Sequence, residues 1–338
     1  MSSLPLARRR AAILLVLTAL LAVALLCSLF IGARTLSPSA VFYALSHPAA
    51  QDPDSIVVAS RIPRTVAGVL IGLALGLAGA LMQALTRNPL AEPGILGINA
   101  GASLGVVLLL FTLGTAAALP LMMLAAFLGA AVTILLVYII ASLGREGATP
   151  IKLALAGAAL AVGLASITNA LLMVSRSALD EYRFWQVGVL TARSVPELMV
   201  GIIPLAAGVL LVAACANVAN AMAMGDDSAA GLGFNVTRAR IVGGIGVVLL
   251  AGTATALAGP IAFVGLIVPH AMRALIGSDY RWLLPASALA GPVLLLGTDI
   301  IGRIIAPPAE VQVGVMCALI GGPLFIVLMR RGLKTVSL

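Results

Sequence analysis

Charged residues are almost absent from the long apolar stretches of this 338-residue chain, and that scarcity constrains the fold more than any other feature. Only 9% of the residues are charged and 62% are hydrophobic. Soluble globular domains average about 25% charged and about 45–50% apolar residues. A soluble protein of this size would lack the charged residues needed to cover so much apolar surface. The composition indicates a polytopic membrane protein, and it excludes a soluble enzyme, a disordered chain and a nucleic-acid-binding protein.

The apolar runs divide into ten segments, most of them close to the roughly 20 residues that a helix needs to cross a bilayer. They lack the alternating pattern of a membrane barrel. We therefore predict an all-α polytopic membrane protein of about ten transmembrane helices, with residues 1–338 forming a single transmembrane domain. The predicted spans are approximately 11–32, 62–84, 94–112, 118–142, 151–173, 198–216, 241–259, 262–277, 283–302 and 310–329.

The basic residues predict the orientation of these spans. With the N-terminus inside and ten spans, thirteen of the twenty basic residues lie inside: Arg8, Arg9, Arg10, Arg87, Arg145, Lys152, Arg238, Arg240, Arg273, Arg281, Arg330, Arg331 and Lys334. The other seven lie outside: Arg34, Arg61, Arg64, Arg176, Arg183, Arg193 and Arg303. Because cytoplasmic loops carry an excess of Lys and Arg, this bias predicts that both termini are cytoplasmic. The isoelectric point of about 10.3 then reflects membrane topology rather than a nucleic-acid partner.

The sequence contains no recognisable catalytic or metal-binding motif. His47 and His270 are the only histidines, and no His-Glu-x-x-His motif or nucleophile elbow occurs. A phosphate-binding loop needs a Gly-Lys pair, but neither lysine, Lys152 or Lys334, follows a glycine. We expect no catalytic residue, no metal site and no cofactor in this chain, so any ATP-driven step must use another polypeptide.

Arg61 and Arg64 lie at the predicted outer mouth of the second span, against the inside bias of the other basic residues. Arg303 falls at the outer end of the ninth span, four residues after Asp299, so those two side chains can pair on one helical face. Two interpretations fit the three arginines. They either snorkel to lipid headgroups or form a basic rim that attracts an acidic partner or an anionic substrate.

The longest predicted inside segment, about 217–240, contains a short polar stretch that predicts a small helix. Asp226 or Asp227 would cap its start, and Gly231 or Gly233 would end it. Such a segment is either an ordinary amphipathic connector or the surface that meets a cytoplasmic partner.

Polar residues inside the spans are few. Ser166, Thr168 and Asn169 would suit a weakly polar pathway for a bulky substrate, or they form hydrogen bonds between helices. The nearly uncharged span centres argue against a proton- or sodium-coupled secondary transporter, which places ionisable groups near mid-membrane.

Several sequence blocks resemble the permeases of the iron-siderophore and vitamin B12 ABC importers. They occur in the family's order and extend over nearly the whole chain: Arg61–Thr65 (RIPRT), Gly79–Gly97 (GALMQALTRNPLAEPGILG), Gly259–His270 (GPIAFVGLIVPH), Asp299–Arg303 (DIIGR) and Gly321–Phe325 (GGPLF). Two shorter stretches, Arg183–Gln186 and Asp279–Trp282, resemble the ferric-enterobactin permease subunits within that family.

The resemblance implies the type II ABC importer permease fold, in a bacterial inner membrane, with several partners. These are a second permease subunit, identical or a paralogue, two cytoplasmic ATPases that carry ATP and Mg, and a periplasmic or lipid-anchored binding protein. It also implies docking of that binding protein on Arg61, Arg64 and Arg303. A coupling segment at about 217–238 would contact an ATPase through Gly225, Asp226, Asp227, Gly231, Leu232 and Gly233.

The implied cargo is a ferric siderophore, with a catecholate of the enterobactin type favoured by the narrower resemblance. Vitamin B12 and haem are alternatives, and an ion-coupled secondary transporter is a distant one. A cytoplasmic gate is expected at the Asn88–Pro93 turn, with Asn88 and Pro89, and at the loop near Thr149 and Pro150.

Overall fold

The computed structural model describes residues 6–48, 50–114, 119–143, 149–190, 194–307 and 309–336, and these residues form helices and connections without a strand. This confirms the all-α prediction. The elements are α1 (Leu6–Phe30), α2 (Pro38–Ser46), α3 (Pro53–Thr86), the 3₁₀ turn η1 (Pro93–Leu96), α4 (Ile98–Leu113), α5 (Leu119–Ser142), α6 (Pro150–Val174), α7 (Arg176–Gln186), α8 (Val195–Val200), α9 (Ile202–Ala214), α10 (Ala216–Ala223), α11 (Asp226–Gly231), α12 (Val236–Ala258), α13 (Val264–Ile276), α14 (Tyr280–Ile304) and α15 (Val313–Val336).

Each of the ten predicted apolar segments coincides with a helix, but not all of these helices are long enough to count as spans. In the described part of the chain, six helices can cross a membrane by length and composition, and the pair α9–α10, bent by 49°, makes a seventh. The helices α4, α13 and α15 are shorter apolar helices. The count of ten is reached only when these three are included.

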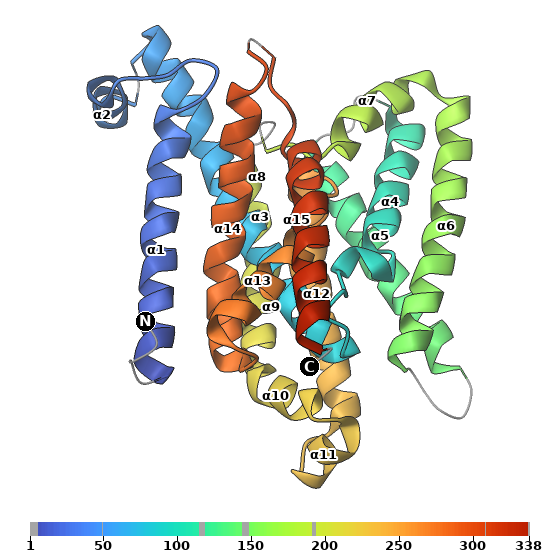
Figure 1. Ribbon diagram of the computed structural model, residues 1–338. Helices are drawn as coiled ribbons and strands as arrows, with labels where there is room; N and C mark the ends of the chain where they lie inside the picture. The colour runs from blue at the N-terminus through green and yellow to red at the C-terminus, as the bar shows by residue number, and fades with distance from the viewer. Residues whose placement is uncertain are drawn as a thin grey trace.

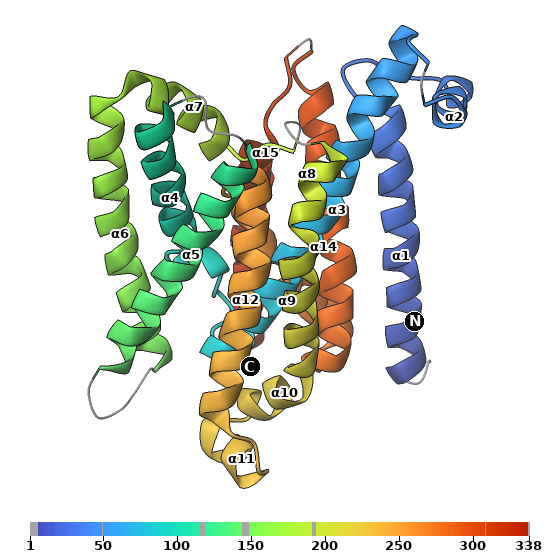
Figure 2. The same cartoon turned by 180° about the vertical axis from the view of Figure 1, so that it is seen from behind.

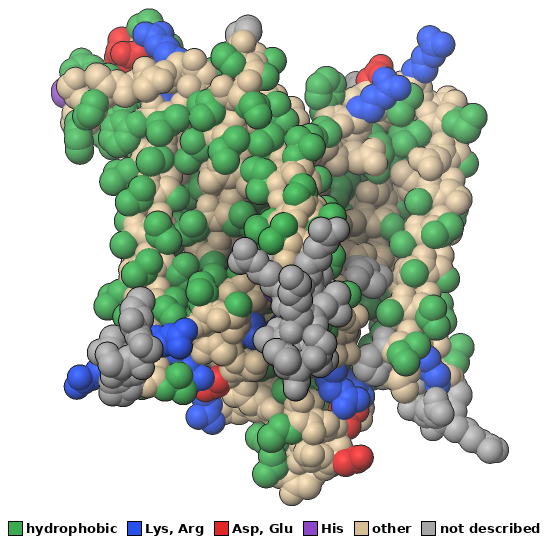
Figure 3. Space-filling model, viewed as in Figure 1, with side chains coloured by type: hydrophobic (Ala, Val, Ile, Leu, Met, Phe, Trp, Pro, Cys, Tyr) green, Lys and Arg blue, Asp and Glu red, His purple; other side chains and the backbone are tan. Residues whose placement is uncertain are grey.

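The helices stand roughly parallel, and their connections gather at two ends (Figures 1 and 2). The first and last described residues lie on the side of α10 and α11, which we call the α11 end. The opposite α2 end carries α2, α7 and the connection between α14 and α15. Charged side chains lie near these two ends of the face in Figure 3 and leave its middle apolar. Of the residues used to predict orientation, Arg145 and Arg193 lie outside the described residues.

Helix α3 runs through the centre of the bundle, whereas α1, α5 and α6 lie at its periphery (Figure 1). The glycines of α3 allow the backbones of other helices to approach closely. A Cβ added at Gly72 would lie 2.6 Å from the backbone of Pro292 in α14, and one at Gly79 would overlap the carbonyl of Gly265 in α13. Since lipid tails are as apolar as the side chains, such close packing, rather than the hydrophobic effect, holds membrane helices together.

The start of α3 differs from the prediction. The apolar run begins at residue 62, but the helix begins at Pro53, because the side chain of Asp52 accepts the Ser55 N–H at 3.1 Å and Pro53 suits the first helical position. Arg61 and Arg64 therefore lie within the helix, more than two turns after its start, instead of at its mouth.

Candidate functional site

A buried ionic cluster joins α3 to α14 near the α2 end. Arg64 donates to the Asp299 carboxylate from Nε at 3.0 Å and from Nη2 at 2.8 Å. Arg303 donates to the same carboxylate from Nε at 2.9 Å, as its four-residue spacing predicted. Glu310, in the connection to α15, accepts from Arg64 Nη1 at 2.5 Å. Asp299 has no exposed surface and Arg303 is 1% exposed, so the two arginines share one buried carboxylate, with Glu310 as a second counterion at the edge of the cluster.

The end of α1 is bound to this cluster by hydrogen bonds. Arg303 donates from Nη1 to the Ser28 carbonyl at 2.8 Å and from Nη2 to the Ser28 hydroxyl at 3.1 Å. That hydroxyl lies 2.7 Å from the hydroxyl of Thr65 on α3. Arg61 donates to the Leu29 carbonyl at 2.7 Å. The N–H groups of both arginines thus satisfy carbonyls at the end of α1, and three helices meet at one point.

The structure brings the three predicted arginines together, but it does not expose them as a rim. Arg61, Arg64 and Arg303 are all buried in this chain. The physical reason is that α3 begins before them, so they face α1 and α14, and charges in an apolar interior need partners. Arg34 is the exposed cation beside them, with 58% of its side chain accessible and Asp54 at 2.7 Å. The docking role of the three arginines stays a prediction.

A pocket of about 290 Å³ opens beside the cluster. Its walls contain four arginines and one carboxylate, Glu310. With the neighbouring Asp54 and Asp299 included, the arginines still outnumber the carboxylates by one, so the pocket offers a positive potential to an entering acidic group. It is lined by Ala33, Arg34, Val57, Ser60, Arg61, Arg64, Arg303 and Glu310.

At the opposite end, the predicted short helix exists as α11, but neither aspartate caps it. Gly225 takes the N-cap position at φ +114°, a conformation open to glycine. Asp226 is instead held by two arginines, with Arg240 Nη2 at 2.7 Å and Arg87 Nη2 at 3.7 Å. The prediction of an aspartate cap was wrong because these charges compete for the carboxylate. Asp227 is exposed on the first turn.

The C-terminal end of α11 follows the prediction. The helix ends at Gly231, and Gly233 adopts φ +86°. The N–H of Gly233 donates to the Ala230 carbonyl at 2.9 Å, and the N–H of Phe234 donates to the Ala229 carbonyl at 3.0 Å. This is the hydrogen-bond pattern of a Schellman motif. It presents Leu232, which is 61% exposed, at the tip of the segment.

Helix α10 is fixed to the start of α14, where Asp279 also binds α1. Asn220 donates to Asp279 at 2.8 Å and accepts the N–H of Tyr280 at 2.8 Å. Arg10 Nη1 lies 3.3 Å from the Asp279 carboxylate. Partial burial raises the pKa of Asp279, but the hydrogen bond from Asn220 and the charge of Arg10 outweigh it, so the pKa lies below its ordinary value. The α10–α11 segment is therefore attached to the bundle on one side and exposed at its tip.

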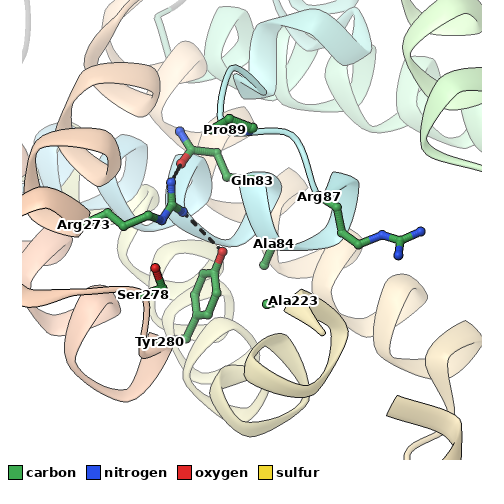
Figure 4. A pocket seen from close by; sticks show the side chains of 8 residues that line it. All are labelled: Gln83, Ala84, Arg87, Pro89, Ala223, Arg273, Ser278 and Tyr280. Carbon is green, nitrogen blue, oxygen red and sulfur yellow. Dashed lines mark hydrogen bonds between the residues drawn. The ribbon is translucent and has the colours of Figure 1, made fainter. Parts of the chain in front are cut away.

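A pocket of about 260 Å³, lined by several polar side chains, lies where α3, α10, α13 and α14 meet (Figure 4). Arg273 crosses it and donates to Gln83 at 3.0 Å and to the Tyr280 hydroxyl at 3.3 Å. The pocket is lined by Gln83, Ala84, Arg87, Pro89, Ala223, Arg273, Ser278 and Tyr280. A residue of the predicted gate, Pro89, and a residue of α10, Ala223, thus border one cavity.

The turn that follows α3 is ordered by its own side chains. Asn88 accepts the N–H of Leu90 at 2.9 Å, and Glu92 accepts the N–H of Phe263 at 2.7 Å. Phe263 adopts φ +69° in the connection between α12 and α13. Two non-helical segments far apart in sequence are thereby joined. The role of Asn88 and Pro89 as a gate stays a prediction.

The predicted residues of α6 are spread along the helix and do not form one site. Thr149 caps α6 through the N–H of Lys152 at 3.4 Å, and Pro150 is its first residue. The hydroxyls of Ser166 and Thr168 donate to carbonyls of their own helix, at 2.9 Å and 2.8 Å. Ser166 and Asn169 are exposed, whereas Thr168 is buried. Among the described residues, neither hydroxyl links two helices.

Comparison with known proteins decides the family. Residues 20–331 match the model of the FecCD transport family. The chain belongs to this family. It is 44% identical to the ferric enterobactin transport system permease protein FepD of Escherichia coli (strain K12), over 92% of this chain and 93% of that protein. It is 36% identical to the hemin transport system permease protein HmuU of Yersinia pestis, over 80% and 82% of the two chains.

The fold is also that of a solved transporter. A structure described as an inward-facing conformation of a metal-chelate type ABC transporter matches with a TM-score of 0.82 and 26% identity, over 95% of this chain and 99% of that one. The FecCD family and this fold confirm the resemblance found in the sequence blocks. In the described part of the chain, no group of three or more His, Cys, Asp or Glu side chains could hold a metal ion.

Sequence reasoning missed the partners of the predicted residues. Glu310, Gln83 and Tyr280 carry no pattern of their own, and Arg273 was counted only as a topological charge. Gln83 and Tyr280 did lie inside family-like stretches, Gly79–Gly97 and Asp279–Trp282, and these were the available signals.

The ionic cluster leads to a stability prediction. We expect Asp299→Asn to lower the free energy of unfolding by about 3–5 kcal/mol, because it removes the carboxylate shared by two buried arginines. Glu310→Gln, which alters a partly exposed partner, should cost no more than about 1 kcal/mol. Denaturant unfolding in detergent measures both variants. Equal losses would show that Asp299 is not the central counterion.

Proposed function

We propose that this chain is the membrane-spanning permease subunit of an ABC importer that moves a ferric siderophore from the periplasmic side to the cytoplasm. The observation that carries the proposal is the 44% identity, over 92% of the chain, to a ferric enterobactin permease, combined with the shared fold. The proposed location is the bacterial cytoplasmic membrane, crossed many times, with the α11 end inside. The excess of basic residues assigned to that end supports this orientation.

The chain itself performs no chemical reaction in this proposal. ATP and Mg bind to two partner ATPases, in keeping with the missing Gly-Lys pair. A second permease subunit, identical or a paralogue, completes the pathway between the two chains. The exposed Ser166 and Asn169 of α6 would offer weak polar contacts to a bulky chelate along it.

The proposed coupling begins at α10 and α11. An ATPase that closes on ATP displaces the exposed tip formed by Asp227 and Leu232. Because Asn220 holds α10 to Asp279 and the start of α14, that displacement reaches the pocket crossed by Arg273. Gln83, near the end of α3, then moves with Arg273, to which it is hydrogen-bonded. The adjoining Asn88–Pro93 turn opens or closes the pathway. This is a shift between two packed arrangements.

Docking of the binding protein is proposed at the α2 end. A carboxylate of that protein would enter the pocket beside Arg34 and Arg61, where Glu310 already occupies one N–H of Arg64. The arginine cluster acts in this scheme as a fixed positive site whose own carboxylate, Glu310, competes with the partner's. Charge complementarity of this kind guides association.

The cargo is proposed to be a ferric catecholate. The relationship to a hemin permease makes haem a second candidate, and vitamin B12 is the third. In proteoliposomes that contain the permease, its ATPase and its binding protein, we expect ATP-dependent uptake of ferric enterobactin to exceed that of haem and cobalamin by at least about tenfold, a difference of about 1.4 kcal/mol. The control carries an inactive ATPase. Uptake that persists in the control would indicate a secondary transporter, and faster haem uptake would reassign the cargo.

The coupling proposal predicts a separation of ATP hydrolysis from transport. Asp227→Lys should reduce uptake at least about fivefold, because it replaces a negative charge by a positive one at the proposed ATPase interface. Thermal stability should stay unchanged, because the residue is exposed. Asp226 is unsuitable for this test, since it is paired with Arg240. Uptake and phosphate release are measured in proteoliposomes. Asp180→Lys, a change of an exposed residue on α7, is the matched control. Normal coupling of ATP hydrolysis to uptake in Asp227→Lys would show that the ATPase contacts another part of the chain.

The docking proposal predicts opposite effects from two substitutions. Glu310→Gln should tighten binding of the binding protein about fivefold, because it removes the negative charge that competes with the partner's carboxylate, whereas Arg34→Glu should weaken binding by at least as much. Dissociation constants are measured with the importer in nanodiscs, with Asp180→Asn as the control for charge alone. Unchanged affinity in both variants would remove the pocket from the interface.

A further inference from the structure

Helices α5 and α12, which both lie toward the viewer in Figure 2, line an apolar groove of about 470 Å³. Its walls are almost entirely hydrocarbon. It is lined by Phe127, Ala131, Ile134, Leu135, Tyr138, Arg240, Ile241, Gly244, Ile245, Val248 and Leu249.

The groove is hollow at its middle and open to the surroundings of the bundle. A Cβ added at Gly244 would meet no atom within 4 Å in the described structure. Leu135 and Ile245, on either side, are 58% and 49% exposed. In a membrane such a surface contacts lipid chains rather than water, so the groove has the character of a site for a chain of methylene groups.

Two arginines stand at the α11 end of this groove. Arg240 lines it; one of its nitrogens binds Asp226 at 2.7 Å, while its buried Nε has no hydrogen-bond partner in the described structure. Arg238 is exposed and has no ion-pair partner within the described residues. It precedes Ile241 and Ile245 by three and seven residues, so it lies on the helix stripe that forms the groove. A cationic end therefore follows an apolar channel.

We propose that this groove binds one anionic phospholipid, with an acyl chain between α5 and α12 and the headgroup phosphate at Arg238 and Arg240. The dimensions agree with one leaflet: from Arg240 to Leu249, α12 rises about 13 Å, and half of the hydrocarbon core is about 15 Å. Each basic residue at the inner membrane surface attracts anionic lipids with about the energy of one weak ion pair. The bound lipid would rest against Arg240, the partner of Asp226 in α11, and would brace the coupling segment. Only the leaflet assignment depends on the orientation proposed above.

The test is native mass spectrometry of the purified importer, delipidated and then titrated with phosphatidylglycerol or phosphatidylethanolamine. Gly244→Leu should lower the bound phosphatidylglycerol at least about tenfold, because the new side chain occupies the space of several methylenes. Arg238→Gln should reduce the preference for phosphatidylglycerol about fivefold. The controls are Gly297→Leu, another open position, on α14, and Arg183→Gln, an exposed arginine on α7.

Three outcomes would overturn the proposal: equal binding of the two lipids by the unaltered importer, phosphatidylglycerol binding that survives Gly244→Leu, or efficient cross-linking of Ile245→Cys to another subunit, which would show that protein covers the groove. The assay requires no transport. An importer that retains the lipid as expected but takes up no ferric chelate would contradict the proposed function and leave the lipid site intact.

Discussion

Close packing of α3 against α13 and α14 is the contact on which the rest of this structure depends. Lipid tails and aliphatic side chains are equally apolar, so burial alone does not favour one helix arrangement over another. Backbone contacts at Gly72 and Gly79 supply the dispersion energy and the fixed distance that burial cannot. Because α3 is buried along most of its length, its position determines where the peripheral helices can lie.

The few charges serve a different purpose from those of a soluble protein. In an apolar interior an unpaired charge is costly, so Arg64 and Arg303 must meet Asp299, and only a narrow range of helix positions allows this. The cluster thereby selects one register of α3 against α14. At the other end, Asp279 and Asn220 select the position of α10 through partly exposed hydrogen bonds, where water lowers the cost of a mismatch.

Local patterns predicted local structure, and contacts between distant segments escaped them. The apolar runs located the helices, and the four-residue spacing of Asp299 and Arg303 predicted their ion pair. The start of α3 was misplaced because Asp52 and Pro53 begin a helix in polar sequence, before the apolar run. The pairing of Arg64 with Asp299 joins residues 235 positions apart, which no pattern in one sequence reveals. The aspartate cap of α11 failed for the same reason: Arg240 is brought to Asp226 by the fold. Family resemblance therefore named the arginines without showing that they are buried.

The same two helices connect the proposed sites at both ends. Helix α3 carries Arg61 and Arg64 near one end and Gln83 near the other, and its 34 residues span about 51 Å. Helix α14 begins at Tyr280, beside the pocket at the α11 end, and carries Asp299 in the ionic cluster. Since the glycines of α3 let the two backbones approach closely, as at Gly72 and Pro292, we expect a change at either end to move both helices together. Coupling across the membrane then needs no chain of polar residues through the apolar interior: two closely packed rods, each with a charged contact at both ends, are sufficient.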